Sequence, residues 1–460
     1  MAHLYISAAH KTSGKTTISI GLCRELRRRD LTVQPFKKGP DYIDPLWLSQ
    51  ASGRTCLNLD FHTMAREEIR DAFAGEMGGA DIGVIEGNLG LFDAVDLHGS
   101  NSNAELAKHL QAPVILIIDA EGMTRGVAPL LLGYQTFDPT IAIAGIVLNR
   151  VGGMRHEANL RRIVEHYTDI PLLGLVHRDS GIEIAQRHLG LMPSNEDQAA
   201  EPHIEAIRSQ VAEQVDVDGI LAIAARAPSL TALGGPGSEP HDLVLPRVRI
   251  GIARDQAFGF YYPDDLRALA REGAELVPFS PCEDPELPAV DGLFIGGGFP
   301  EYRMKALEAN RTMRASIADF IASGGAAYAE CGGLMYLATE LRWGDDRCAM
   351  CGVLDADVAM YPRPQGRGYV ILRETPQAPW PRAGTSPGDI MAHEFHHSAV
   401  VAPNSGWTYA YRVTRGSGVD GSHDGIVQGN LLASYAHLRG VGGMRWPARF
   451  VAHVRACRNP

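Results

Sequence analysis

The sequence has no long hydrophobic run and few cysteines. Its apolar stretches have the length of a buried strand, as in residues 114–118, whereas a membrane-spanning helix needs about 18 residues. The first residues lack a basic region followed by an apolar stretch, so we expect no export signal. The 7 cysteines are odd in number and irregularly spaced, which fits a reducing cytoplasm better than a disulfide scaffold. We therefore expect a cytoplasmic protein without a membrane partner.

Basic charge is also scarce. Lys and Arg number 43 against 54 Asp and Glu, which leaves a formal net charge of -11 at pH 7. This balance argues against nucleic acid or an anionic membrane surface as a partner. Hydrophobic residues make up 45% and charged residues 21%, as in ordinary globular proteins. A length of 460 residues predicts two or three domains, but composition names no reaction.

Short apolar runs alternate with amphipathic stretches through the first half of the chain. The spacing of Ile18, Leu22 and Leu26 is typical of one face of a helix. Residues 196–225 read as a polar helix. The continuous apolar runs favour strands that are covered on both faces of a parallel sheet, so we predict a doubly wound α/β fold. The expected strands are residues 4–7, 33–36, 82–85, 114–118 and 143–148.

Glycine and proline crowd into residues 227–246, which therefore read as a linker. A second α/β series begins beyond it, with expected strands at residues 248–253, 293–296 and 326–329. The predicted division is a domain over residues 1–226, the linker over 227–246, and a second α/β domain over 247–460.

A phosphate-binding loop is indicated directly after the first expected strand. Residues 9–16 follow the pattern G-x4-G-K-[ST], with Ala9 in place of the first glycine. In such loops the backbone amides surround phosphate oxygens, the lysine reaches the outer phosphates, and the hydroxyl binds magnesium. The sequence therefore predicts an ATP site with Mg²⁺, and the expected nucleotide-binding residues of the loop are Gly14, Lys15, Thr16 and Thr17.

Acidic residues follow two other expected strands. Glu86 ends residues 81–86, where doubly wound sheets place ligand groups, and it can hold Mg²⁺. Asp41 and Asp44 lie three residues apart, and they can organise metal ions or position a carboxylate substrate. From the residues alone, a turn with two acids is an equal alternative. Asn149 closes the fifth strand and could contact a nucleotide base.

Residues 35–45 read PFKKGPDYIDP, and this segment resembles the cobyrinic (hydrogenobyrinic) acid a,c-diamide synthases. The likeness covers nearly the whole chain in the right order. It continues through residues 51–54, 58–60, 86–87, 90–93, 187–191, 254–258, 279–281, 296–298, 300–301, 329–333, 393–396 and 434–437.

The resemblance implies a two-part amidase. The N-terminal domain resembles a dethiobiotin-synthetase-like ATPase that phosphorylates acetate side chains of a tetrapyrrole. The C-terminal domain resembles a class I glutamine amidotransferase, which takes glutamine as a substrate and releases ammonia. The phosphoryl-transfer roles of the family fall on Asp41, Asp44 and Glu86, with Thr16, Asp44 and Glu86 as metal ligands and Lys37 as a further nucleotide-binding residue. We also expect that the protein can form a homodimer.

The acceptor is a finer question within this family. Lys38, Trp47 and residues 58–64 differ from what is expected of typical corrin enzymes, and they look more like relatives that amidate sirohaem. We therefore favour sirohaem as the acceptor, with cobyrinate or hydrogenobyrinate as the alternative.

Cys331 stands between an apolar stretch and two glycines, at an expected strand-to-helix turn. Such a cysteine is expected to be exposed, with its pKa lowered by the helix N-terminus. By the resemblance, His437 is the base that accompanies this nucleophile. Leu438 and Arg439 follow His437, so the usual histidine-x-glutamate pairing is missing, and Asp255 is a weak candidate to orient the histidine.

Other features are less informative. Gly297 and Gly298 are expected to give backbone N–H groups to an oxyanion. A lone C-x-x-C at Cys348 and Cys351 does not make a zinc site. A rival reading is a partitioning-type P-loop ATPase, but its signature lysine is replaced here by His10.

Overall fold

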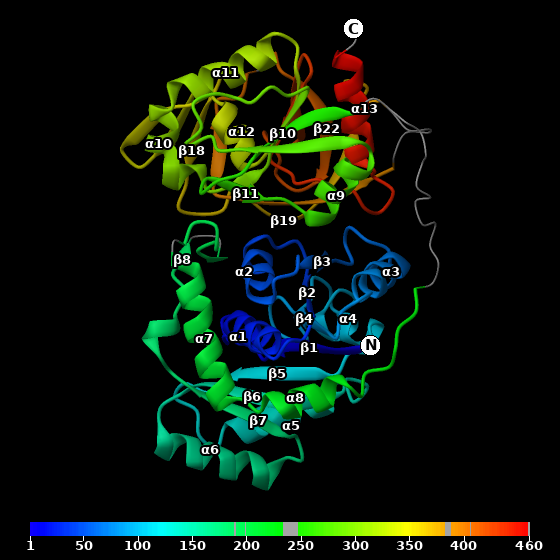
Figure 1. Ribbon diagram of the computed structural model, residues 1–460, viewed down its shortest axis with the longest axis vertical. Coiled ribbons are helices and arrows are strands. Elements are labelled where there is room, and N and C mark those ends of the chain that lie inside the picture. The colour runs from blue at the N-terminus through cyan, green and yellow to red at the C-terminus, as the bar shows by residue number, and fades with distance from the viewer. Residues whose placement is uncertain (188–189, 198, 233–246, 382–387, 405, 459–460) are drawn as a thin grey trace. The chain divides into compact units, whose positions relative to one another are not determined.

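The computed structural model describes residues 1–187, 190–197, 199–232, 247–381, 388–404 and 406–458. The chain forms two compact units, Met1–Glu239 and Pro240–Pro460 (Figure 1). Most of the expected linker, residues 233–246, lies outside the described residues, so the domain boundaries stay a prediction. None of the described helices combines the length and the apolar character needed to cross a membrane.

The first unit is built on a seven-stranded sheet in the order β3-β2-β4-β1-β5-β6-β7, and every pairing in it is parallel. This confirms the predicted doubly wound parallel sheet. The central strands are almost completely buried, as their continuous apolar sequences require. The strands are β1 Ala2–Ala8, β2 Val33–Lys38, β3 Leu57–Leu59, β4 Ile82–Glu86, β5 Val114–Asp119, β6 Ile143–Val151 and β7 Leu172–His177.

Helix α1 packs against α2 and α7 (Figure 1). Ile18, Leu22 and Leu26 are buried on it, which confirms the expected helical face. Gly21 permits the close approach to α7, because a Cβ there would lie 2.5 Å from a methyl group of Val211. The helices are α1 Lys15–Arg28, α2 Ile43–Ser52, α3 Arg66–Glu76, α4 Asn103–His109, α5 Val127–Phe137, α6 Met154–Tyr167, α7 Ala200–Gln214 and α8 Val217–Ala224.

The expected single helix over residues 196–225 is wrong, because the structure has two helices there. Val215 is extended, and the side chain of Asp216 accepts the N–H of Gly219 and caps α8. An aspartate that can cap a new helix competes with continuation of the old one. Between α6 and α7 the unit also contains η1 Ser180–Ile182, β8 Gln186–Arg187 and β9 Gly190–Leu191.

The second unit has a nine-stranded sheet in the order β12-β10-β13-β15-β24-β23-β22-β19-β20. Pairings from β12 to β24 are parallel, and those from β24 to β20 are antiparallel. The sequence predicted the parallel part and missed the antiparallel part. The strands of this sheet are β10 Val248–Ala253, β12 Ala274–Phe279, β13 Gly292–Ile295, β15 Ala326–Glu330, β19 Gly366–Glu374, β20 Ile390–His396, β22 Thr408–Arg415, β23 His423–Gln428 and β24 Leu431–Ser434.

Separate apolar clusters form the core of this unit, one around Phe258 and Tyr336 and the other around Tyr328 and Trp446. Its remaining elements are β11 Phe258–Phe260, α9 Pro263–Arg271, β14 Gly297–Gly298, η2 Pro300–Arg303, α10 Met304–Ala309, α11 Arg311–Ala322, α12 Gly332–Leu337, β16 Glu340–Trp343, β17 Asp346–Ala349, β18 Asp357–Met360, β21 Ser398–Val401 and α13 Trp446–Arg458.

Candidate active sites

The phosphate-binding loop joins the end of β1 to the start of α1. Gly14 precedes the helix with φ of 90°, a conformation that favours glycine. The amide of Asn149 donates to the Ser13 carbonyl at 3.0 Å, and a Cβ on Gly14 would lie 2.0 Å from the same amide nitrogen. Asn149 therefore holds the loop backbone, whereas the sequence suggested a contact with a base. The glycine is required by the close packing of this side chain.

Lys15 and Thr16 form the first turn of α1. Lys15 is buried, and its pKa is lowered to about 8, mainly by desolvation and then by the neighbouring Lys37. Thr17 is half-buried next to them. A buried lysine at a helix N-terminus makes an environment that favours a polyphosphate, because phosphate oxygens would replace the water that the ammonium has lost.

Side chains from four elements meet at the carboxyl ends of β2 and β4. The Lys37 ammonium donates to Asp44 at 2.5 Å and to Glu86 at 2.6 Å, and it lies 3.7 Å from Asp41. The Thr16 hydroxyl donates to Glu86 at 2.9 Å and to Asp44 at 3.3 Å. Parallel strands bring these residues together because β2, β4 and β1 are neighbours in the sheet.

Burial and mutual charge set the protonation of this cluster. Desolvation opposes the charge of Lys37, but Asp44 and Glu86 outweigh it, so the Lys37 pKa is raised. Desolvation also opposes the charge of Asp44, yet Lys37 holds the Asp44 pKa below its usual range. The pKa of Asp41 rises to about 7 through desolvation and the Asp44 charge, although 32% of its side chain is exposed. The Glu86 pKa is raised, mainly by desolvation.

Asn58 supports the turn that carries Asp41. Its amide donates to the carbonyl of Gly39 at 2.8 Å and to that of Asp41 at 2.7 Å. Asp41 in turn accepts the N–H of Ile43 at 2.9 Å at the start of α2. The sequence identified Asn58 only as part of a motif, and its contacts assign it a supporting role.

The cluster fits a magnesium ion. Oε2 of Glu86 is completely buried without a hydrogen-bond partner, and Oε1 accepts from the Thr16 hydroxyl, which also donates to Asp44. Within the described ranges, no group of three or more His, Cys, Asp or Glu side chains could hold a metal alone. Magnesium bound through two carboxylates and a hydroxyl would complete its shell with phosphate oxygens and water.

Cys331 lies between β15 and α12 in the second unit. It has φ of 49°, and its N–H donates to the Ser434 carbonyl at 2.7 Å. The expected strand-to-helix turn is present, but the side chain is buried and only 7% exposed. Burial raises the pKa of the Cys331 thiol, and Glu301 raises it further, while the Gly332 N–H acts in the opposite direction. The expectation of an exposed cysteine with a lowered pKa is therefore wrong, because desolvation outweighs the helix N-terminus.

His437 follows β24, and its ring is held by several groups. Its backbone pairs with that of His393, and the rings of the two histidines stack with centroids 4.8 Å apart. Nδ1 of His437 lies 3.3 Å from Oε2 of Glu330. The sequence predicted no role for Glu330, although this residue ends β15 and directly precedes Cys331.

Asp255 does not take the suggested role. Its carboxylate accepts the N–H groups of Ala257 at 2.7 Å and Cys282 at 2.9 Å, and the hydroxyl of Ser280 at 3.0 Å. Asp255 therefore joins its own loop to the loop that follows β12.

The glycines of β14 lie against the cysteine turn. A Cβ on Gly297 would lie 2.8 Å from Cε1 of His437, so this position must stay small. A Cβ on Gly332 would lie 3.1 Å from the nitrogen of Gly298. The backbone of Gly298 and that of Gly332 are therefore adjacent, which suits a pair of oxyanion donors.

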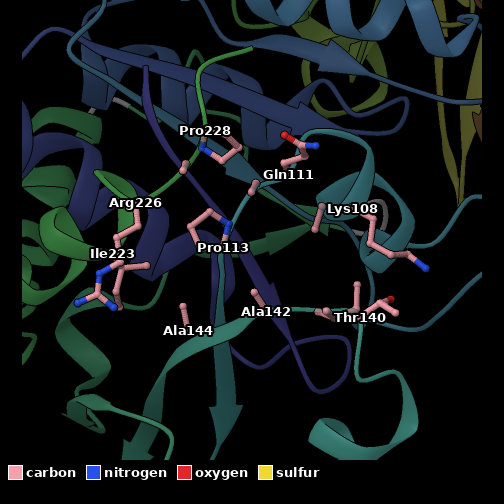
Figure 2. Close-up of a pocket in the computed structure, with 13 residues that line it drawn as sticks. Lys108, Gln111, Pro113, Thr140, Ala142, Ala144, Ile223, Arg226 and Pro228 are labelled. Atoms are coloured by element: carbon pink, nitrogen blue, oxygen red, sulfur yellow. The ribbon is translucent and has the colours of Figure 1, made fainter.

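A cavity of about 480 Å³ lies elsewhere in the first unit. It is lined by Pro113 and Ala142, which precede β5 and β6, so it lies at the amino ends of these strands, away from the phosphate loop. Figure 2 shows Lys108 and Arg226 on opposite sides of it. Lys108 already pairs with Asp138 at 3.1 Å. This cavity contributes nothing to the two candidate sites.

Comparisons with known proteins match two families to separate parts of the chain. Residues 8–191 match the family described as the CobQ/CobB/MinD/ParA nucleotide binding domain. Residues 249–440 match the CobB/CobQ-like glutamine amidotransferase domain. The N-terminal part is thus a nucleotide-binding domain and the C-terminal part a glutamine amidotransferase domain.

Full-length relatives give a finer comparison. The chain is 48% identical to a cobyrinate a,c-diamide synthase from Magnetococcus marinus, with 98% of this chain and 96% of the relative covered. It is 41% identical to one from Methanosarcina acetivorans, with 95% and 92% covered. Among solved structures, PurLQS from Thermotoga maritima has a TM-score of 0.36 at 17% identity, over 46% of this chain and 99% of that chain. The chain belongs to the cobyrinate a,c-diamide synthase family.

Proposed function

We propose that this protein uses ATP and glutamine to convert the a- and c-acetate carboxylates of cobyrinate into amides. The observation that supports cobyrinate as the acceptor is the full-length likeness to relatives named cobyrinate a,c-diamide synthase. The geometry that supports the chemistry is a phosphate loop next to a carboxylate cluster in one unit. In the other unit, a buried cysteine and a buried histidine follow the ends of the neighbouring strands β15 and β24.

The first unit activates the acceptor. A carboxylate is a poor acylating agent, because its leaving group would be oxide. An acceptor carboxylate oxygen attacks the γ-phosphorus of ATP, the bond to the β-phosphate oxygen breaks, and the products are an acyl phosphate and ADP. Lys15 faces the phosphates from the start of α1, and Asp41, held by Asn58, positions the acceptor.

Lys37 has a supporting role in this step. It neutralises Asp44 and Glu86 in the absence of other cations, and its ammonium can instead pair with phosphate oxygens. Thr16, Asp44 and Glu86 are the proposed magnesium ligands. When bound, Mg²⁺ would neutralise charge on the β- and γ-phosphates.

The second unit releases ammonia from glutamine. His437 takes the thiol proton of Cys331, the sulfur attacks the amide carbon, and His437 returns the proton to the departing nitrogen. Water then hydrolyses the thioester to glutamate and restores the thiol. The ammonia attacks the acyl phosphate, phosphate leaves, and the cycle repeats at the second acetate.

The preference for sirohaem that the sequence suggested receives no support from the relatives, which are named for cobyrinate. Trp47, one basis of that preference, is fully buried, and its indole N–H donates to the Met192 carbonyl. Trp47 is therefore part of the buried core of the first unit. Lys38 is also buried, at 3.3 Å from Oδ1 of Asn88, and desolvation lowers its pKa to about 8. Sirohaem is kept as the competing acceptor in the binding test.

The Cys331→Ser variant tests the proposed division of labour. It should lower glutamine-dependent amidation by about 10³-fold or more and leave ammonia-dependent amidation close to wild type, because only the sulfur nucleophile is lost. Cys457→Ser, a change of another cysteine in the same unit, is the matched control and should leave both activities intact. Loss of both activities in Cys331→Ser would contradict the proposal.

Acceptor identity is tested by parallel titration of the pure protein with cobyrinate and with sirohaem, followed by absorbance. We expect cobyrinate to bind and to be amidated, and sirohaem to bind more weakly. Amidation of sirohaem alone would overturn the choice of acceptor and leave the amidation chemistry intact.

A further inference from the structure

The second unit has a carboxylate beside the ring of His437. In the sequence, Leu438 and Arg439 occupy the places where a glutamate would follow the histidine. In the structure, Glu330 approaches from a different strand, and its Oε2 lies 3.3 Å from Nδ1 of His437. Both side chains are almost completely buried, with 4% exposed in each.

Glu330 is fixed at its other oxygen. Oε1 accepts the N–H of Leu438 at 3.0 Å and the hydroxyl of Tyr328. Tyr328 and Glu330 lie two positions apart on β15, so both side chains project from the same face of the strand. The carboxylate is therefore held both from its own strand and from the residue that follows His437.

The ring of His437 is fixed on its faces and edge as well. The backbone N–H of His437 donates to the His393 carbonyl at 2.8 Å, and the rings of the two histidines are nearly parallel, at 15°. His393 is itself within 3.2 Å of the Tyr262 hydroxyl. Gly297 leaves room for Cε1 of His437. With Nδ1 facing the carboxylate, Nδ1 carries a proton and Nε2 is the nitrogen that can accept one.

A charged partner matters here because the nucleophile is buried. Taking the thiol proton of Cys331 turns His437 into an imidazolium in a site from which water is largely excluded. A carboxylate at Nδ1 stabilises that cation and holds the ring in the productive tautomer, as the aspartate of a serine-protease triad does.

We propose that Glu330 positions His437 and stabilises its protonated form, in place of the glutamate that is missing after the histidine. Glu330 acts through His437 and touches no substrate, so it is a positioning residue. The inference rests on the roles proposed for Cys331 and His437. It assigns the third member of the triad to the residue immediately before the nucleophile.

Glu330→Gln separates this role from a structural one, because its side-chain oxygen can still accept from Leu438 and Tyr328. In the full-length protein with saturating glutamine, kcat for glutamine hydrolysis should fall by about 10²-fold or more. KM for glutamine should stay within about threefold, because the substrate contacts are unchanged. Ammonia-dependent amidation should equal that of wild type, and the unchanged KM for glutamine reports correct folding of the second unit.

Tyr328→Phe is the matched control. It removes a hydrogen bond to Glu330 and leaves the negative charge against His437, so kcat should remain within a few fold of wild type. A purely structural role would instead make the two variants lose activity together.

A pair of shorter variants keeps the test decisive if Glu330→Gln does not fold. Glu330→Asp should retain more kcat than Glu330→Asn, since the two differ only in charge. Equal kcat in that pair, or wild-type kcat in Glu330→Gln, would overturn the inference.

The Cys331→Ser variant distinguishes a failure of the proposed function from a failure of the role proposed for Glu330. Glutamine hydrolysis that persists in Cys331→Ser would defeat the proposed function itself. An inactive Cys331→Ser beside a fully active Glu330→Gln would defeat only the role of Glu330.

Discussion

Burial opposes the charged form of side chains at both sites, and the neighbouring charges decide whether it prevails. Lys37 keeps its proton although it is fully buried, because Asp44 and Glu86 surround it. Desolvation and the charges of Glu301 and Glu330 oppose the thiolate of Cys331, so its pKa is raised. The thiol is therefore neutral at rest, and the nucleophile is formed by proton transfer during the reaction.

This gives a prediction for the pH dependence of Cys331 alkylation. The thiolate is the reactive form, and a raised pKa shifts its formation to higher pH than the usual value of about 8.5. In the absence of glutamine, alkylation of Cys331 by iodoacetamide should be slow at neutral pH and still rising beyond pH 9. The rate can be measured by mass spectrometry of the peptide that contains Cys331. A plateau below pH 8 would contradict the raised pKa.

Part of each site could be predicted from the sequence, and the rest could not. The pattern around Gly14, Lys15 and Thr16 has a local spacing, so the sequence predicted it. Glu330 reaches His437 across 107 positions of sequence, and only the pairing of β15 with β24 brings the two segments together. A carboxylate one residue before a cysteine carries no spacing signal for a histidine so far away.

At the scale of elements, glycines at the ends of helices and strands make room for functional side chains. Gly14 and Gly297 both face a side chain at distances that no Cβ could tolerate. The apolar runs predicted the buried parallel strands well. The antiparallel strands β19, β20, β22 and β23 mix exposed and buried positions, so their sequences carry a weaker signal.

Gly14→Ala tests the phosphate loop. The added Cβ would meet the Asn149 amide at 2.0 Å in a backbone conformation that alanine rarely adopts. We expect ATP-dependent amidation to fall by about 10²-fold or more, because the loop must shift. Glutamine hydrolysis measured alone should persist. Gly133→Ala, in an open position on α5, is the control and should change neither activity. A fully active Gly14→Ala would show that the loop does not bind phosphate as described.

Gly297→Ala tests whether the His437 ring needs the space next to Gly297. Its Cβ would lie 2.8 Å from Cε1 of the ring, so the ring must shift from its position. Glutamine hydrolysis should fall by about 10²-fold, while ammonia-dependent amidation stays intact. Gly388→Ala is the matched control, since nothing lies within 4 Å of its new Cβ. Equal glutaminase rates in the two variants would rule out this packing constraint.

At the scale of the whole molecule, each unit has its own sheet, its own buried apolar core and its own reactive groups. A net charge of -11 is unfavourable at long range for an acidic acceptor. Three lysines can offset this charge locally, namely Lys15, Lys37 and Lys38, and all are buried at the carboxyl edge of the first sheet. Lys37 is neutralised there by carboxylates, so Lys15 and Lys38 carry the available charge. A homodimer stays a prediction.

The central claim is that nitrogen from glutamine reaches a carboxylate that ATP has activated. The most direct measurement is the fate of a heavy-nitrogen label in the side-chain amide of glutamine. The purified protein is incubated with cobyrinate, ATP, Mg²⁺ and the labelled glutamine, and the products are analysed by mass spectrometry.

The account predicts cobyrinate that carries labelled amides at the a and c positions, with one ADP and one phosphate formed for each amide. Omitting ATP should abolish amidation. The contradicting result is consumption of ATP and glutamine while cobyrinate remains unlabelled and unchanged in mass.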